Sequence, residues 1–203
     1  MKPEQAVLNI LLAGVGGQGI ILAGKLLARV GITLGLDVKM SEIHGMAQRG
    51  GSVVTEIRMG PQVNSPLVER GQADFIMALE QLEAWRLIPY LKKGGTVVVS
   101  TQVLKPLPVI TGKQEYPAGL AAKLSRAAGK AIILDAYGLA VAAGEPRAAN
   151  VVLLGALLRE MGVGEEEGLA ALEAVVPARY LEKNKTAFLK GYNAVGIDYN
   201  TAG

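Results

Sequence analysis

A short aliphatic run that leads directly into a glycine-rich turn constrains this chain more than any other feature. Residues 7–13 (VLNILLA) have the length and composition of a buried strand, and residues 18–35 carry apolar side chains at helical spacing. The intervening residues 14–19 (GVGGQG) satisfy G-x-G-x-x-G in the strand-to-helix context that this motif requires. The sequence therefore predicts a Rossmann-like first βα unit.

The same alternation of short apolar runs and longer amphipathic ones continues along the chain. It predicts a three-layer α/β/α fold with a mostly parallel, or mixed, sheet in one domain over residues 1–203, with a helical extension at about 146–195. The alternating strand 52–59 is expected to be half-exposed or at an edge. Further strands are expected at 37–40, 74–78, 96–100, 109–111 and 130–134. Helices are expected at 80–91, 117–128, 147–161, 165–175 and 178–194.

Composition excludes several kinds of chemistry. The 203 residues are 50% hydrophobic and 19% charged, which is the profile of a folded chain. With no cysteine and one histidine, a disulfide framework, a thiol nucleophile, a cysteine-bound zinc or iron–sulfur cluster and a multi-histidine metal site are excluded. The net charge of +3 is spread along the chain, so no nucleic-acid partner is expected. No membrane span or signal peptide is evident, and a cytoplasmic protein is expected.

The glycine loop allows two interpretations. Its glycines and the following helix terminus resemble an anion-binding site, and a dinucleotide would also require an acidic residue near the end of the second strand. Asp37 lies at the start of that strand and Glu42 just past its expected end. In the alternative interpretation the glycines permit close packing or contact with a partner. The residues concerned are Gly14, Gly16, Gly17, Gln18 and Gly19.

Residues 41–52, expected to be largely a loop, are the second candidate for function. His44 can transfer a proton near neutral pH, and Arg49 can bind a carboxylate or phosphate in bidentate fashion. In the structural interpretation, Glu42 and Arg49 pair across the loop and His44 caps it. The candidate catalytic residues are His44 and Arg49. The candidate wall of a site includes Ser41, Glu42, Gln48, Gly50 and Gly51.

Three other features have simpler interpretations. Glu80 and Glu83 share a helix face with Arg86 and are expected to form surface ion pairs. Asp135 ends a strand and is expected to cap the following helix. Asn150, inside an apolar helix, is expected to form a hydrogen bond in the core or at an interface.

The motifs together resemble one enzyme family. Residues 9–28 (NILLAGVGGQGIILAGKLLA), 38–60 (VKMSEIHGMAQRGGSVVTEIRMG) and 64–86 (NSPLVERGQADFIMALEQLEAWR) resemble the gamma-type subunit of the 2-oxoacid:ferredoxin oxidoreductases. The pattern at Glu80, Glu83, Ala84 and Arg86 is most like the indolepyruvate branch. Tyr116-Pro117 and residues 150–156 also fit, so the resemblance spans most of the chain.

The resemblance implies a role within a complex. The family oxidatively decarboxylates a 2-oxoacid to an acyl-CoA, with ferredoxin as the electron acceptor. It implies a larger alpha subunit that holds thiamine diphosphate, magnesium and [4Fe-4S] clusters, with coenzyme A as co-substrate, and a small subunit that holds none of them securely. The glycine loop and residues 44–51 would then face the partner. Two alternatives stay open, a free-standing NAD(P)-dependent oxidoreductase and a nucleotide-binding regulatory module.

Overall fold

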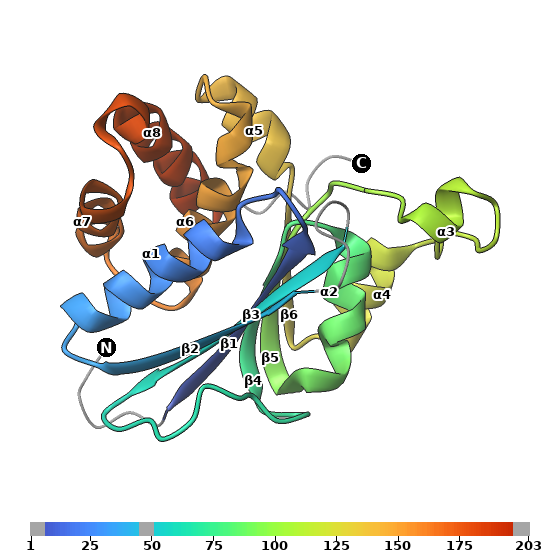
Figure 1. Ribbon diagram of the computed structural model, residues 1–203, viewed down its shortest axis with the longest axis horizontal. Coiled ribbons are helices and arrows are strands. Elements are labelled where there is room, and N and C mark those ends of the chain that lie inside the picture. The colour runs from blue at the N-terminus through green and yellow to red at the C-terminus, as the bar shows by residue number, and fades with distance from the viewer. Residues whose placement is uncertain (1–6, 45–50, 197–203) are drawn as a thin grey trace.

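A mixed sheet forms the centre of the molecule in the computed structural model, which describes residues 7–44 and 51–196 (Figure 1). Within these residues one sheet has six strands, in the spatial order β2 (Asp37–His44), β3 (Ser52–Gly60), β1 (Leu8–Val15), β4 (Ala73–Ala78), β5 (Leu91–Ser100) and β6 (Lys130–Leu134). β1, β4, β5 and β6 pair in parallel, whereas β3 runs antiparallel to both β1 and β2. The expected α/β fold with a mixed sheet is confirmed.

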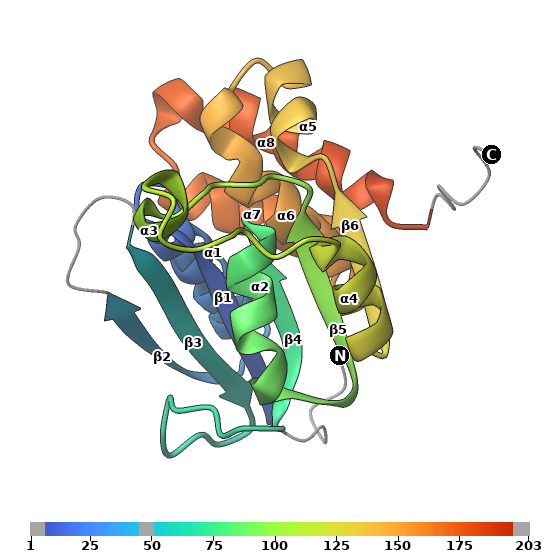
Figure 2. The same cartoon turned by 90° about the vertical axis from the view of Figure 1, so that its right-hand side faces the viewer.

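Helices lie on both sides of this sheet (Figures 1 and 2). One side carries α1 (Ile20–Thr33), α6 (Ala149–Glu160), α7 (Glu165–Val175) and α8 (Ala178–Ala194), and the other carries α2 (Gln81–Leu87) and α4 (Leu120–Ala127). The shorter elements are α3 (Leu107–Ile110), α5 (Ala136–Ala142) and two 3₁₀ turns, η1 (Ile88–Tyr90) and η2 (Pro146–Ala148).

The aliphatic run of β1 is explained by its central position. Ile10 and Leu12 point into the core that contains α1 and α6, and Leu11 and Ala13 point into the core beneath α2. All four side chains are fully buried, because a strand covered by helices on both faces has no solvent face.

The edge strand differs from its sequence prediction. Residues 41–44 continue β2 instead of opening a loop, and Ser41 and His44 pair with Glu56 and Val53 of β3. These residues are largely polar, as suits an edge strand that is open to solvent. They therefore lack the apolar alternation by which a strand is predicted from sequence.

Strand β3, expected at an edge or half-exposed, lies inside the sheet between β1 and β2. The connection 61–72 covers its polar face. The Val68 N–H donates to Glu56 Oε2 at 2.7 Å, and Arg58 Nη1 donates to the Ser65 carbonyl at 3.0 Å. These partners let Glu56 and Arg58 sit beneath a loop rather than in water.

Several boundaries also differ. Residues 107–110 are helical, not a strand, because Pro108 suits the first turn of a helix. Helix α4 begins after Gly119, whose φ of +66° sets its start, and not at Pro117. The expected helix 80–91 ends at Leu87. The range of α5 was not predicted. The prediction that Asp135 caps a helix is confirmed, because its carboxylate accepts from the Gly138 N–H at 2.9 Å.

Candidate functional site

The ends of the strands bring the candidate residues to one edge of the sheet. β1, β2, β4, β5 and β6 all end there, and the antiparallel β3 begins there. The chain leaves β1 through α1 on one side and β4 through α2 on the other, so the connections diverge between these strands (Figure 2). Open α/β sheets bind ligands at such a point. We call it the carboxyl edge. It comprises residues 14–19, 41–44, 51–52, 80–83 and 100–104.

A glutamine closes the glycine loop from inside. Gln18 Oε1 accepts from the Val15 N–H at 2.7 Å, and Gln18 Nε2 donates to Gln102 Oε1 at 3.0 Å and to the Leu79 carbonyl at 3.4 Å. A Cβ on Gly14 would lie 2.8 Å from Gln18 Oε1, so a larger residue there would push the Gln18 amide out of these hydrogen bonds. The amide thus connects the ends of β1, β4 and β5.

Gly19 meets a second constraint. Its φ is +80°, and Asn150 Nδ2 of α6 donates to its carbonyl at 2.9 Å. A Cβ on Gly19 would lie 2.6 Å from that nitrogen, so both backbone conformation and packing demand glycine. The expectation that Asn150 forms a hydrogen bond in the core is confirmed, and Gly19 packs closely against its side chain.

The two candidate loops come together at Gly51. The Gly16 N–H donates to the Gly51 carbonyl at 2.9 Å, and the Ser52 hydroxyl donates to the carboxylate of Glu83. Arg86 Nη1 donates to the other oxygen of Glu83 at 2.8 Å. Gly51 is therefore held between the glycine loop and α2.

The described residues cover only part of the second candidate. Ser41 and Glu42 lie in β2, and the backbone of His44 ends this strand. Gln48, Arg49 and Gly50 lie outside the described residues, as does the side chain of His44. Their roles stay predictions.

Glu80, immediately after β4, holds together more of the carboxyl edge than the sequence indicated. Its side chain is 1% exposed and caps α2 by accepting from the N–H groups of Leu82, at 2.7 Å, and Glu83, at 3.0 Å. It also accepts from the Leu104 N–H at 3.3 Å and from the Tyr116 hydroxyl.

The prediction of surface ion pairs was therefore wrong for Glu80. For Glu83 the pair with Arg86 exists, but the side chain of Glu83 is buried, at 7% exposed. Both residues are buried because residues 101–119 and the start of β3 cover the beginning of α2, which local spacing does not reveal. The sequence offered one sign of this role, because Glu80 stands directly between a strand and a helix, where a side chain can cap the helix.

The hydrogen bond of the Tyr116 hydroxyl should make the free energy of unfolding depend on pH in the alkaline range. Partial burial, together with its hydrogen bond to Glu80, raises the pKa of Tyr116 above its ordinary value of 10.0. As the pH rises, Tyr116 therefore loses its proton in the unfolded chain before it does so in the folded one. The stabilisation that this hydroxyl gives the folded state is complete below pH 10 and is lost as the pH rises further. We expect Tyr116→Phe to be about 1–2 kcal/mol less stable than wild type at pH 7.

Urea unfolding between pH 7 and 11 measures this effect. The difference in unfolding free energy between wild type and Tyr116→Phe should shrink above pH 10. Tyr137→Phe removes an exposed hydroxyl, and its unfolding free energy should differ from that of wild type by the same amount at every pH. A constant difference for Tyr116→Phe across this range would contradict the assignment.

The first strands argue against a dinucleotide site. A dinucleotide-binding sheet places the second strand beside the first, so that its acidic residue reaches the ribose. Here β3 lies between β1 and β2, which puts Glu42 on a strand about 10 Å from β1, or two strand spacings.

A metal or cluster has no ligand set in the part of the chain that the structure describes. No group of three or more histidine, aspartate or glutamate side chains gathers there, and the sequence has no cysteine. The residues present do not fit an iron–sulfur cluster. Within residues 7–44 and 51–196, no helix combines the length and apolarity that a membrane span needs.

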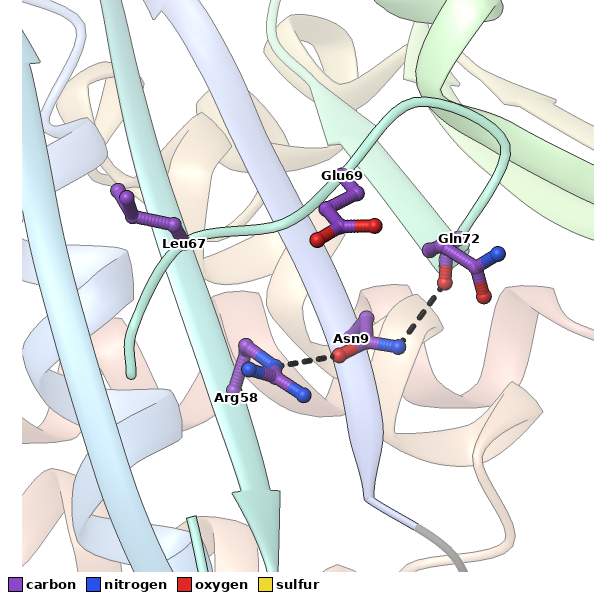
Figure 3. Close-up of a pocket in the computed structure, with 5 residues that line it drawn as sticks. All are labelled: Asn9, Arg58, Leu67, Glu69 and Gln72. Atoms are coloured by element: carbon purple, nitrogen blue, oxygen red, sulfur yellow. Dashed lines mark hydrogen bonds between the residues drawn. The ribbon is translucent and has the colours of Figure 1, made fainter. Parts of the chain in front are cut away.

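A polar pocket of about 220 Å³ lies at the opposite end of the sheet (Figure 3). Its polar groups bind one another: Arg58 Nε donates to Asn9 Oδ1 at 2.8 Å, and Asn9 Nδ2 donates to the Gln72 carbonyl at 3.0 Å. It lies at the start of β1, away from the carboxyl edge. Its lining residues are Asn9, Arg58, Leu67, Glu69 and Gln72.

Comparison with known proteins adds an independent line of argument. A family profile described as pyruvate ferredoxin/flavodoxin oxidoreductase matches residues 9–194. Indolepyruvate oxidoreductase subunit IorB of Thermococcus kodakarensis is 39% identical over 191 residues, covering 92% of this chain and 95% of the relative.

Two solved structures share the fold. The gamma subunit of a keto/oxoacid ferredoxin oxidoreductase from Geobacter sulfurreducens has a TM-score of 0.69 and 26% identity, covering 92% of this chain and 97% of that one. A 2-oxoglutarate:ferredoxin oxidoreductase from Magnetococcus marinus has a TM-score of 0.70 and 23% identity, covering 94% of this chain but 31% of that one. The profile match and the similarity over nearly the whole chain show that it belongs to the pyruvate ferredoxin/flavodoxin oxidoreductase family.

Proposed function

We propose that this chain is the smaller, gamma-type subunit of a 2-oxoacid:ferredoxin oxidoreductase of the indolepyruvate type. The enzyme would oxidatively decarboxylate a 2-oxoacid and join the acyl group to coenzyme A, with two electrons passing to ferredoxin. The similarity to IorB over nearly the whole of both chains carries the proposal. An aromatic 2-oxoacid is the substrate class that follows.

The redox machinery then belongs to a larger partner subunit. Because this chain has no cysteine, it supplies no thiolate for an iron–sulfur cluster. Thiamine diphosphate, magnesium and the [4Fe-4S] clusters are therefore assigned to the partner, where they would supply the carbanion and electron-transfer chemistry.

The part played by this chain is to complete the site at its carboxyl edge. The segment 45–50 joins His44 and Gly51, and Gly51 is fixed by Gly16 and, through Ser52, by Glu83. A rigid frame of this kind suits the precise placement of functional side chains. In this proposal Arg49 binds a carboxylate or phosphate at the approach to the partner's site, and His44 holds or transfers a proton there.

Co-expression with the larger subunit of the indolepyruvate oxidoreductase from the same organism tests the proposal. The purified lone chain should not oxidise indolepyruvate, whereas the complex should do so with coenzyme A and ferredoxin. Arg49→Ala and His44→Ala should each lower the activity of the complex at least about tenfold, which corresponds to the loss of one charge-assisted hydrogen bond. The melting temperature of the isolated chain should stay unchanged.

Arg70→Ala, which removes an exposed cation far from the carboxyl edge, is the matched control and should retain full activity. Turnover by the lone chain, or specific micromolar binding of NAD(H) in calorimetry, would instead favour a free-standing oxidoreductase. Equal loss of thermal stability in the two alanine variants would return Arg49 and His44 to a structural role.

A further inference from the structure

The segment between β5 and α4, residues 101–119, projects from the carboxyl edge and is here called the arm (Figure 1). Its short helix α3 buries none of its own residues. Leu107 and Ile110, three residues apart on this helix, are 71% and 67% exposed. Neighbouring large aliphatic side chains this exposed are unusual away from interaction sites, whereas single ones are normal.

The arm is ordered despite lacking a core of its own. Glu80 binds it at both ends, through the Leu104 N–H and the Tyr116 hydroxyl. Inside the arm, the Lys113 N–H donates to the Pro108 carbonyl at 2.9 Å, and the Thr111 N–H donates to the Leu107 carbonyl at 2.9 Å. An apolar tip that is already fixed loses little conformational entropy on binding, as a recognition element requires.

Charge indicates what the tip fits. Lys105 and Lys113 flank α3, and neither forms an ion pair with any residue in the described ranges. The exposed Glu115 follows them, so the arm has a net charge of +1, with its two positive charges beside the apolar tip. Val103, at the base of the arm, adds a third exposed aliphatic side chain. The complementary surface is an apolar depression with carboxylates at its rim.

We propose that the arm is a docking element that inserts Leu107 and Ile110 into the larger subunit of the complex. This inference rests on the proposed function. The arm starts at the carboxyl edge and is held by Glu80, so a partner that covers this edge meets the arm as well. In the Magnetococcus marinus enzyme the region similar to this chain makes up 31% of one polypeptide. There the same fold is covalently joined to a much larger part of the enzyme.

A second copy of this chain is the less suitable occupant. Stable interfaces bury about 1,200–2,000 Å² in total, and two or three aliphatic side chains on a narrow projection fall well short of that area by themselves. A large surface that extends from the carboxyl edge to the arm meets the requirement.

The test compares a double variant of the arm with a single variant of another exposed leucine, each co-expressed with the larger subunit. Leu107→Asp/Ile110→Asp should weaken the association with the larger subunit at least about hundredfold, since it removes two apolar side chains from the buried contact and puts two carboxylates in their place. Leu67→Asp places one such carboxylate on a residue that is 59% exposed at the opposite end of the sheet, and this variant should bind like wild type. Calorimetry of the purified subunits gives both dissociation constants.

The outcomes separate the two proposals. If wild type does not bind the larger subunit, the proposed function fails. If wild type and Leu107→Asp/Ile110→Asp bind equally well, the docking role of the arm is overturned while the proposed function stands. Sedimentation of the isolated chain supplies a further check, because a wild-type dimer that Leu107→Asp/Ile110→Asp dissociates would show that a second copy occupies the arm. The melting temperature of the isolated variant should match that of wild type, since both side chains are exposed.

Discussion

Gly191→Ala is expected to lower the free energy of unfolding by about 2 kcal/mol or more, or to prevent folding altogether. Gly191 lies where α8 crosses α6, and a Cβ there would lie 1.8 Å from the carbonyl oxygen of Val152. That oxygen belongs to helix backbone and cannot rotate away, so the two helices would have to separate. Overpacking usually costs about 1–3 kcal/mol, and a clash with helix backbone belongs at the upper end of that range or above it, so it outweighs the gain of about 1 kcal/mol from alanine's helix propensity.

Urea denaturation followed by far-UV circular dichroism measures this change. Gly155→Ala should behave similarly, because a Cβ there would lie 2.3 Å from the Phe188 carbonyl in the same helix pair. Asn193→Ala, two residues along on the exposed side of α8, is the matched control and should be as stable as wild type or slightly more so. A Gly191→Ala protein with wild-type stability would show that α6 and α8 are not packed this closely.

Glu80→Ala should have the second large effect, a loss of about 3 kcal/mol in unfolding free energy together with release of the arm. The substitution leaves two N–H groups at the start of α2, the Leu104 N–H and the Tyr116 hydroxyl without their acceptor. A buried donor without a partner costs about 1–3 kcal/mol, and these groups regain only part of that from water.

Two controls make this result specific. Glu80→Gln keeps one carbonyl oxygen and the size of the side chain, so it should fall between wild type and Glu80→Ala. Glu69→Ala removes an exposed carboxylate at the opposite end of the sheet and should change stability by less than about 0.5 kcal/mol. Limited proteolysis with trypsin reports the arm directly, since cleavage after Lys113 should accelerate in Glu80→Ala, whereas Lys105 precedes Pro106 and is not a tryptic site. Unchanged cleavage would show that Glu80 does not hold the arm.

The candidate site was only partly predictable. The glycine loop could be found because its residues are contiguous and its backbone demands are local. Glu80, Glu83, Gln102 and Tyr116 were missed as one group because they lie on separate elements. Their hydrogen bonds depend on where β4 and β5 end, not on spacing along the chain. Glu80 in particular looks like a surface helix residue until residues 101–119 are placed over it.

The second strand shows a similar limit. A polar edge strand obtains its hydrogen bonds from the neighbouring β3, so residues 41–44 carry no apolar alternation that would mark them. The alternation of polar and apolar residues in β3 likewise did not show that this strand lies inside the sheet. Glu56 and Arg58 can lie there because the connection 61–72 supplies their hydrogen-bond partners.

The amino-acid sequence by itself determined the α/β class, the strand–glycine loop–helix unit and the absence of cysteine chemistry, because each depends on residue type or on short-range periodicity. It also carried enough similarity to show the family. The tertiary structure alone decided which side chains share the carboxyl edge, that Glu80 is buried there and that Leu107 and Ile110 are exposed. Burial is the reason: it is set by what packs over a residue from distant parts of the chain, and only the assembled sheet brings those parts together.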